Sequence, residues 1–554
     1  MGVRRNILRL LAVLFAFAFI AAACGGDDDS SSSSSSESET TADDHGDGDH
    51  DHEEEETGGG LSQDAVENAV SGDDDAEEEV DEEAPSFDTS TMEGLEASWE
   101  YNREKLVAMV TEKMESGEWG VGSDNILRGP TGFEIDLNDC PSDWSDTGGL
   151  TADAIRIGHT TAQSGNLAAY GNIAYGWDSY NKYVNENGGI AGRDIELIVK
   201  DDGYVAAQTI EFIDELIESE NVFMIVTLGS PNTLAVYDTI NAECIPQPFV
   251  MTGHPAWGDP EIHPWTSGMI MSYSTEAVLW GTWIKQNLAD QLPVKVAGLV
   301  MDNDFGLAYE LGFEAYAEGN PDIVSEYLPV RHDPAAPTLT NEVTTIAAFA
   351  PDVFISMTAG NPCLLAIQEV EASGLLDTLS AAFTPSVCKG IAAYMAPAGM
   401  AADGWWIAGG GWIDSTDANY VDAPYIKFLN DTLAADGLDP TVSLYGTGFG
   451  DYGWSYNEVL RVAAELPGGL SRSNFILALR TFSGHHPKLQ EGIEFGAWGA
   501  SDGYFVEGSD FSQFDATDQA WVQVGDLVDA NGLSPNCRWD KDNGGCRELC
   551  CQKL

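Results

Sequence analysis

The fold of this chain is decided by IRIGHTTAQSGNLAAYGNIAYGWDSYNKYVNENGGIAGRDIELIVKDDGYVAAQ, residues 155–208, and by FMIVTLGSPNTLAVYDTINAECIPQPFVMTGHPAW, residues 223–257. Short apolar runs rich in β-branched residues alternate here with longer runs of helical periodicity. The strand-like runs lie at residues 155–157, 195–200, 223–227 and 249–251. Strands that alternate with helices predict a parallel α/β unit.

A second series of the same kind follows residue 257, after a connecting piece that contains Trp265 and Tyr273. Its strand-like runs lie at residues 294–301, 324–330, 353–357, 381–384 and 405–408. Helical runs lie at residues 307–318, 341–348, 362–373, 425–435 and 456–466. The late segments GIEFGAW, GYFVEG and AWVQVGDL are strand-like and are expected to complete both units. With 554 residues the chain exceeds a single core, so two or more domains are expected.

The chain carries 92 acidic and 24 basic residues and a formal net charge of −68. Residues 24–93 contain 27 of the acids and no Lys or Arg, and the first ten residues contain three Arg. The remainder therefore holds 65 acids and 21 bases, a net charge of −44. This excess of negative charge argues against nucleic acid and anionic membrane surfaces as partners.

The first 24 residues, MGVRRNILRLLAVLFAFAFIAAAC, combine a basic start, an apolar run and small residues before Cys24. This is the pattern of a secretory signal peptide. It resembles a bacterial lipoprotein signal, with Ala21 where that pattern most often has Leu, and the resemblance implies lipidation of Cys24. An uncleaved transmembrane anchor is disfavoured because an apolar run of about 15 residues is short for a bilayer. We expect an extracytoplasmic protein, lipid-anchored to the cell membrane at the cell surface or in the periplasm.

Residues 25–93 are rich in Gly, Ser, Asp and Glu and have almost no aromatic residues. Such a segment buries too little apolar surface to fold, so we predict a disordered acidic linker. The side chains of His45, His50 and His52 could bind divalent cations. A solvated acidic segment without bound metal is favoured, because no rigid structure holds these histidines in a coordination geometry.

Residues 94–150 are expected to form a helical lead-in. Apolar residues fall near one helical face between residues 93 and 117, beginning with Leu95 and Trp99. We expect this helix to dock on the core, with a partner-binding helix as the alternative. The sequence Cys140-Pro-Ser-Asp-Trp144 then leads through Gly148 and Gly149 into the first α/β unit.

Apart from Cys24 the chain has eight cysteines, an even number that suggests disulfides in an exported protein. Cys363 and Cys388 follow consecutive predicted strands, whose ends lie side by side, so we predict that they pair. The tail, residues 536–554, holds Cys537, Cys546, Cys550 and Cys551. It lacks the second CxxC or His pair of a zinc site, so a disulfide knot is favoured over a metal cluster.

Several segments carry a resemblance to a known family: IRIGHTTAQSGNLAAYG, NENGGIAGRDIELIVKDDG, VTLGSPNT and LVMDNDFGLAY, with the turn at residues 187–190 the most specific. Together they resemble the type I periplasmic binding proteins of the branched-chain amino acid group. The resemblance spans residues 151–529. It implies two Rossmann-like lobes joined by three crossovers, a small-molecule ligand between them and an ABC permease as partner. The expected parts are lobe 1 at residues 151–270, lobe 2 at 271–410 and return segments at 411–535.

Candidate ligand-binding residues lie after the predicted strands, because ligands of open parallel sheets bind beyond the carboxyl ends of the strands. Helix N-termini there also present free N–H groups. In the first unit these loops hold Ser164 and Asn166, Ser230 and Asn232, and Thr252, Gly253 and His254. In the second unit they hold Phe305, Asn361 and Ser386.

The resemblance implies that Ser230 and the backbone at Gly253 and His254 hold a ligand carboxylate. The alternative role of Ser230 is to cap its own helix, with Pro231 in the first turn. In the second unit Phe305 stands where the family often has Tyr, and Ser386 stands where a carboxylate would hold an α-ammonium group. An amino acid, an amide, urea or a carboxylate therefore all stay open as ligands. Asp202 and Asp304 are further candidates for a ligand charge, or else helix caps.

Six aromatic residues near strand ends are candidates for lining a pocket, or for filling gaps in the core: Trp257, Trp265, Trp405, Trp406, Trp412 and Tyr452. An aromatic cage for a quaternary ammonium ligand is a weaker version of the same idea.

Enzyme motifs are weak in this sequence. Residues 499–503 match GxSxG but lie between strand-like runs, with no later His for a triad. Residues 448–453 match GxGxxG without a surrounding βαβ unit. We therefore expect no catalytic residue, cofactor or metal site. The leading hypothesis is the solute-binding component of an ABC importer. A surface sensor of the same fold is the alternative, and an extracytoplasmic hydrolase a third and disfavoured one.

Overall fold

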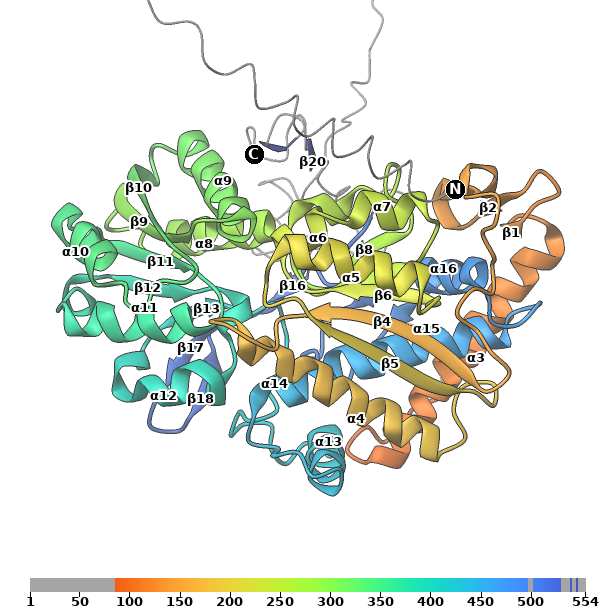
Figure 1. Ribbon diagram of the computed structural model, residues 1–554. Helices are drawn as coiled ribbons and strands as arrows, with labels where there is room; N and C mark the ends of the chain where they lie inside the picture. The colour runs from red at the N-terminus through yellow and green to blue at the C-terminus, as the bar shows by residue number, and fades with distance from the viewer. Residues whose placement is uncertain (1–84, 497–501, 530–538, 541–544, 547–554) are drawn as a thin grey trace, which may run out of the picture. The chain divides into compact units, whose positions relative to one another are not determined.

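The computed structural model describes residues 85–496, 502–529, 539–540 and 545–546. The predicted signal with Cys24 lies outside these residues, as do Cys537, Cys550 and Cys551. The linker predicted at residues 25–93 lies outside them as far as residue 84, and its last two residues belong to a helix that begins at Met92. The described chain forms two α/β lobes, seen side by side in Figure 1, with the strands of each lobe covered by helices.

The first lobe contains the parallel strands β5 (Asp194–Asp201), β4 (Ala154–Thr161) and β6 (Met224–Thr227), in that order across the sheet. Beyond β6 lie β7 (Gln247–Val250) and β8 (Thr266–Gly268), which also pair in parallel. The Met251 amide donates to the Thr227 carbonyl oxygen at 2.9 Å and joins β7 to β6. All four predicted strands of this unit are confirmed.

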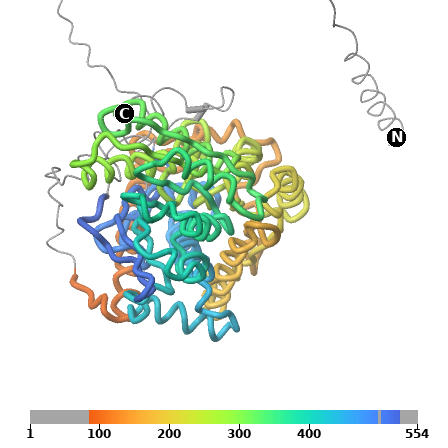
Figure 2. The backbone as a smooth tube through the Cα atoms, turned by 90° about the vertical axis from the view of Figure 1, so that its left-hand side faces the viewer, coloured from red at the N-terminus to blue at the C-terminus, as the bar shows by residue number. Residues whose placement is uncertain are grey.

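The second lobe repeats this strand order in one seven-stranded sheet. The parallel strands are β10 (Val324–His332), β9 (Val294–Met301), β11 (Val353–Met357), β12 (Ala381–Thr384) and β13 (Trp406–Ala408). Two antiparallel strands, β17 (Phe511–Asp515) and β18 (Ala520–Gln523), extend the sheet past β13. Figure 2 shows them in blue beside the green and teal chain of this lobe.

The helices follow the strands as the periodicity predicts. In the first lobe they are α4 (Asn172–Glu186), α5 (Ala206–Glu218), α6 (Ser230–Leu234) and α7 (Tyr237–Ala242). In the second they are α9 (Asp304–Gly319), α10 (Thr340–Phe349), α11 (Asn361–Ala372) and the short α12 (Ala396–Ala398). The return segments contain α13 (Pro424–Ala435), α14 (Ser443–Gly446) and α15 (Trp454–Glu465).

The short helices α12 and α14 were not predicted, and neither were two longer ones, α8 (Tyr273–Asn287) and α16 (Arg472–Thr481). Every residue of α8 from Tyr273 to Ile284 is buried, and so is every residue of α16 from Arg472 to Arg480. A helix buried on all sides has no polar face, so it lacks the amphipathic period that sequence reasoning depends on.

Three segments pass between the lobes, as the family resemblance implies. The first leads from β8 into α8, which packs on α9, and the second leads from β13 to α13, which packs on α4. The third runs from Tyr504, which bridges to Gly268 of the first lobe, to β17 of the second. Near it lie the short strands β14 (Ser483–Gly484), β15 (Phe495–Gly496), β16 (Gly508–Ser509) and β19 (Val528–Asp529).

The segment ahead of the first lobe begins with the predicted helix, α3 (Met92–Ser116), which ends at Gly117 with φ +77°. Trp99 of this helix packs edge-on against Trp454 of α15. A small antiparallel sheet follows, and sequence periodicity did not reveal it because its strands are two or three residues long. Its strands are β1 (Gly120–Val121), β2 (Ile126–Arg128) and β3 (Glu134–Asp136).

Two disulfides are present among the described residues. The predicted Cys363–Cys388 pair is confirmed, with an S–S distance of 2.00 Å. Cys140 pairs with Cys244, which was not predicted, and this bond fastens the lead-in to the first lobe. The tail contributes β20 (Trp539–Asp540) and β21 (Gly545–Cys546). None of the helices in the described part of the chain combines the length and apolarity that a bilayer span requires.

Candidate functional site

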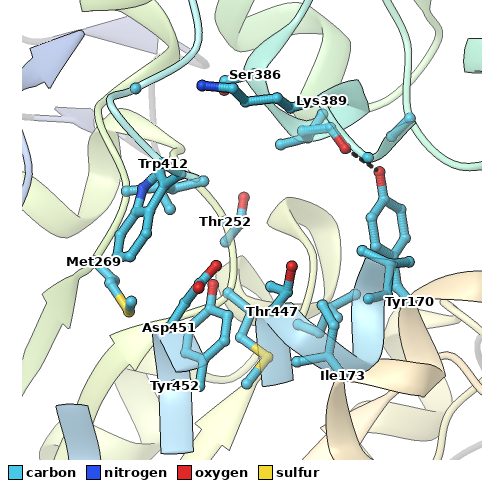
Figure 3. A pocket seen from close by; sticks show the side chains of 18 of the residues that line it. Tyr170, Ile173, Thr252, Met269, Ser386, Lys389, Trp412, Thr447, Asp451 and Tyr452 are labelled. Carbon is cyan, nitrogen blue, oxygen red and sulfur yellow. Dashed lines mark hydrogen bonds between the residues drawn. The ribbon is translucent and has the colours of Figure 1, made fainter. Parts of the chain in front are cut away.

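A cavity of about 140 Å³ lies between the lobes, at the carboxyl ends of the parallel strands (Figure 3). Its walls are mostly apolar and aromatic. The apolar and aromatic residues lining it are Leu167, Tyr170, Ile173, Tyr204, Leu228, Met251, Met269, Ile270, Met271, Tyr273, Phe305, Ala359, Val387, Trp412, Ile413, Leu444 and Tyr452. The polar and glycine residues are Gly229, Thr252, Ser386, Lys389, Gly390, Gly410, Asp414, Thr447 and Asp451.

Thr252 lines the cavity from the first lobe and carries a hydroxyl. Its Oγ1 lies 2.7 Å from Oγ of Ser230 and donates to the Tyr273 hydroxyl at 3.3 Å. Ser230 is fully buried and does not line the cavity, so it supports Thr252 from behind. Gly253 accepts a hydrogen bond from the Tyr273 amide at 2.7 Å through its carbonyl oxygen, and it does not line the cavity either.

Asn232 and His254 are buried away from the cavity. The Asn232 side-chain amide donates to Asp202 at 3.0 Å and to the Thr209 hydroxyl at 2.8 Å. Asp202 also accepts from the Tyr204 amide, so it stabilises the start of α5. His254 Nδ1 accepts from the Ala256 amide at 3.1 Å, and burial lowers the pKa of His254 to about 3. Its imidazole is therefore neutral.

Three predicted residues are exposed and do not line the cavity: Ser164, Asn166 and Asn361. The Asn361 amide donates to the Asn166 carbonyl oxygen at 3.2 Å, and Asn166 Nδ2 donates to the Pro334 carbonyl oxygen at 3.2 Å. These bonds join the first lobe to the second across the mouth of the cavity. Ser164 lies near Gly203 and does not line the cavity.

Tyr170 makes two hydrogen bonds between the lobes, and sequence reasoning missed it. Its hydroxyl donates to the Val387 carbonyl oxygen at 3.2 Å and accepts from the Gly360 amide at 3.1 Å. Burial raises the pKa of Tyr170, so the hydroxyl keeps its proton. With these contacts formed, the structure is a closed form in which the two lobes meet around the cavity.

Phe305 and Ser386 line the cavity from the second lobe. Phe305 packs edge-on against Tyr273 at 5.0 Å between ring centroids. The Ser386 amide and hydroxyl donate to the two carboxylate oxygens of Glu276 at 2.7 Å each, and the Tyr309 hydroxyl donates to one of them at 2.7 Å. Burial raises the pKa of Glu276 to about 7. A carboxylate is thus present at this wall, one layer behind Ser386.

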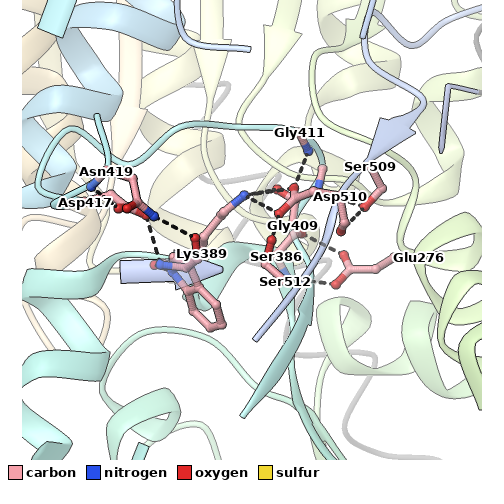
Figure 4. A network of polar contacts seen from close by, with 12 residues as sticks. Glu276, Ser386, Lys389, Gly409, Gly411, Asp417, Asn419, Ser509, Asp510 and Ser512 are labelled. Atoms are coloured by element: carbon pink, nitrogen blue, oxygen red, sulfur yellow. Dashed lines mark hydrogen bonds and ion pairs between the residues drawn. The ribbon is translucent and has the colours of Figure 1, made fainter. Parts of the chain in front are cut away.

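A network of charges joins the crossovers beside the cavity (Figure 4). The Lys389 ammonium lies 2.9 Å from Oδ1 of Asp510, which is fully buried on the third crossover. The Gly411 amide of the second crossover donates to the same oxygen at 3.0 Å. Asp414 accepts from the Ile391 amide at 2.7 Å. The second lobe and two crossovers are therefore held together by buried polar contacts.

The floor of the cavity comes from a π-helix, η9 (Thr447–Gly453), that continues into α15. This segment contains the GxGxxG match, and no strand leads into it, so a dinucleotide-binding turn is excluded here. Its glycines serve packing: a Cβ at Gly448 would overlap the carbonyl oxygen of Ile173 on α4. The other motif, GxSxG, lies partly outside the described residues, including Ser501.

Of the six candidate aromatics, Trp412 and Tyr452 line the cavity. Trp257, Trp265 and Trp405 are fully buried elsewhere, and Trp406 packs on Trp283 at 4.7 Å between ring centroids. Within the ranges that the structure describes, no group of His, Cys, Asp and Glu is arranged to hold a metal ion.

A profile of the periplasmic binding protein family matches residues 154–443, which is more than half of the 554 residues. The chain belongs to this family. Its members act outside the cytoplasm. No curated protein sequence matches the chain.

Solved structures of similar fold include a fatty acid ABC transporter substrate-binding protein from Thermomonospora curvata, with 19% identity and a TM-score of 0.58. The match covers 74% of this binding protein and 96% of that chain. A branched-chain amino acid ABC transporter from Thermus thermophilus with bound valine has 17% identity, coverage of 69% and 97%, and a TM-score of 0.60. A solute-binding protein from R. palustris in complex with benzoate has 19% identity, coverage of 68% and 99%, and a TM-score of 0.55.

Proposed function

We propose that this binding protein captures a small organic solute with an apolar body and a single polar end. The observation that carries the proposal is the lining of the cavity, where side chains such as Met251, Met269 and Phe305 form most of the wall. Burying apolar ligand surface here contributes about 25 cal/mol for each Å² removed from water. A wholly polar solute such as urea would gain little from these walls.

The names of similar proteins support this ligand class. Fatty acid, valine and benzoate each combine an apolar body with a polar group, and each is named for a protein of the same fold. Thr252, Phe305 and Ser386 are the sequence-predicted residues that we propose as direct ligand contacts. Ser230 would act through Thr252, while Asn166 and Asn361 would act on closure of the lobes.

Closure couples binding to transport in this proposal. A ligand that contacts both lobes favours the closed form over an open one by its difference in affinity for the two. The Tyr170 contacts with Val387 and Gly360 form only when the lobes meet. The permease then recognises the closed form. We assign the cavity a binding role without turnover.

We also propose that Cys24 carries a lipid that holds the protein at the membrane. The support is the basic and apolar start of the chain with small residues before Cys24. Metabolic labelling of expressing cells with a radioactive fatty acid tests this. We expect label in the wild type and none in Cys24→Ser; equal labelling of both would refute the assignment.

Thermal unfolding of the purified protein with a panel of solutes tests the ligand class. The panel contains straight-chain fatty acids, branched-chain amino acids, pairs of aromatic amines and carboxylates, and acetamide as a wholly polar member. We expect members with an apolar body to raise Tm and acetamide to have no effect. Thr252→Val should reduce the shift, whereas Ser164→Ala, outside the cavity, should leave it unchanged. No shift with any member would contradict the proposal.

A further inference from the structure

The π-helix η9 places three polar groups on one face. Thr447, Asp451 and Tyr452 are four and five residues apart, and a π-helix has a wider turn than an α-helix because its hydrogen bonds join residues five apart. In Figure 3 the Thr447 hydroxyl, the Asp451 carboxylate and the Tyr452 hydroxyl all point from the floor into the cavity. Thr252 points toward the same space from the first lobe.

These groups have little to bond to within the described residues. Tyr452 is 4% exposed and its hydroxyl makes no hydrogen bond to any described group; the Thr447 hydroxyl makes none either. Asp451 is 7% exposed, and the single described partner of its carboxylate is the Lys488 ammonium at 2.6 Å. Buried polar groups are normally satisfied by a partner, so groups left open toward a cavity point to a ligand.

The side chains beside the floor of the cavity carry a net negative charge. Lys488 pairs with Asp451 and Lys389 pairs with Asp510, and no cation among the described residues forms an ion pair with Asp414. Asp417, also buried, interacts electrostatically with both Asp414 and Lys389 and adds to the excess. The other buried group nearby, His486, is neutral because burial lowers its pKa well below the usual value.

A negative floor repels an anionic ligand group and attracts a cationic one. Lys389 offers no free donor to a ligand carboxylate, since it is engaged by both oxygens of Asp510 and by the Gly409 carbonyl oxygen at 3.3 Å. A primary ammonium group has three N–H donors. The floor offers a matching set of three acceptors in Thr447, Asp451 and Tyr452.

We propose that η9 recognises the ligand by a primary amine, with the ammonium group donating to Asp451, Thr447 and Tyr452 while the apolar body fills the rest of the cavity. This inference rests on the proposed function and names the polar end of the same ligand. The chain's 92 acidic and 24 basic residues add a long-range field that attracts cationic solutes at low ionic strength.

Matched pairs of compounds test the proposal, because each pair shares an apolar body and differs in its charged end. Benzylamine with benzoate, and isopentylamine with isovalerate, are titrated by calorimetry and thermal unfolding. We expect the amines to bind at least tenfold more tightly than the carboxylates. Asp451→Asn should remove most of this preference, whereas Asp422→Asn, a carboxylate with a side chain 90% exposed, should retain it.

Two further variants guard against misfolding of Asp451→Asn, which leaves Lys488 unpaired. Thr447→Val and Tyr452→Phe each remove one acceptor and no charge, and each should weaken amine binding three- to tenfold. Carboxylates that bind more tightly than amines, or an amine preference that survives all three substitutions, would overturn the amine assignment while the proposed function stands. If neither member of any pair binds, and the rest of the panel also fails, the proposed function fails instead.

Discussion

Tyr170→Phe is expected to weaken ligand binding by destabilising the closed form. The substitution removes one hydroxyl, which makes two hydrogen bonds between the lobes, to Val387 and from Gly360. Each bond contributes about 1 kcal/mol net, so the closed form loses about 2 kcal/mol. Since the open form exposes these groups to water, the loss falls on closure alone.

A loss of about 2 kcal/mol corresponds to a Kd about 30-fold weaker. Calorimetry with the tightest-binding panel compound measures this change, and small-angle scattering at saturating ligand reports the fraction of closed molecules. Tyr175→Phe is the matched control, because Tyr175 lies on α4 with 50% of its surface exposed and does not line the cavity. An affinity for Tyr170→Phe within threefold of the wild type, with unchanged scattering, would refute the reasoning.

Three further predictions concern stability. Paired Ser substitutions that remove Cys140–Cys244 should lower the free energy of unfolding by about 4–5 kcal/mol, and those that remove Cys363–Cys388 by about 3.5 kcal/mol. The first disulfide closes a loop of 104 residues and the second a loop of 25. A denaturant titration that gives the reverse order would contradict this. Burial raises the pKa of Glu276 in the folded protein from its ordinary value of 4.5 to about 7. The stability that this protonated side chain contributes is therefore fully present below pH 4.5 and is lost as pH rises through 7. Between pH 5 and 8 the free energy of unfolding of the wild type should therefore fall by up to about 3 kcal/mol relative to that of Glu276→Gln. If the free energies of unfolding of the two proteins change with pH in parallel, Glu276 does not have this effect. Gly448→Ala should lower the free energy of unfolding by about 1–3 kcal/mol, because the added Cβ forces η9 away from α4. Gly390→Ala is the control, since the nearest neighbour of its Cβ lies at 3.4 Å, and it should lower the free energy of unfolding less when both variants are compared by thermal unfolding.

The alternation of strands and helices predicted the architecture well, because β-branched runs such as those in β4 and β9 are buried on both faces of parallel sheets. Elements buried on every side, such as α8, left no periodic signal. The Asn187–Ile190 turn was also readable, since Gly188 and Gly189 have φ of +100° and +66°, a region that favours Gly.

The site was predicted less completely. The expectation that ligand-binding residues lie in the loops after strands identified Thr252, Phe305 and Ser386, because the strand ends of both lobes face one cavity. The same expectation missed Thr447 and Asp451, because they lie on a helix in a return segment. The glycines at Gly448 and Gly450 resembled a phosphate-binding turn, and only the packing of η9 on α4 shows their use. A close helix contact between distant segments leaves no local pattern in the sequence.

The Cys140–Cys244 bond has a mechanical consequence. The chain enters the folded part through α3, which packs on α13, α15 and α16, and the disulfide ties the end of this lead-in to the first lobe. Tension applied to the chain ahead of α3 would therefore be transmitted to one lobe through a covalent link. The second lobe would bear none of that tension, so it would stay free to rotate between open and closed positions relative to the first lobe.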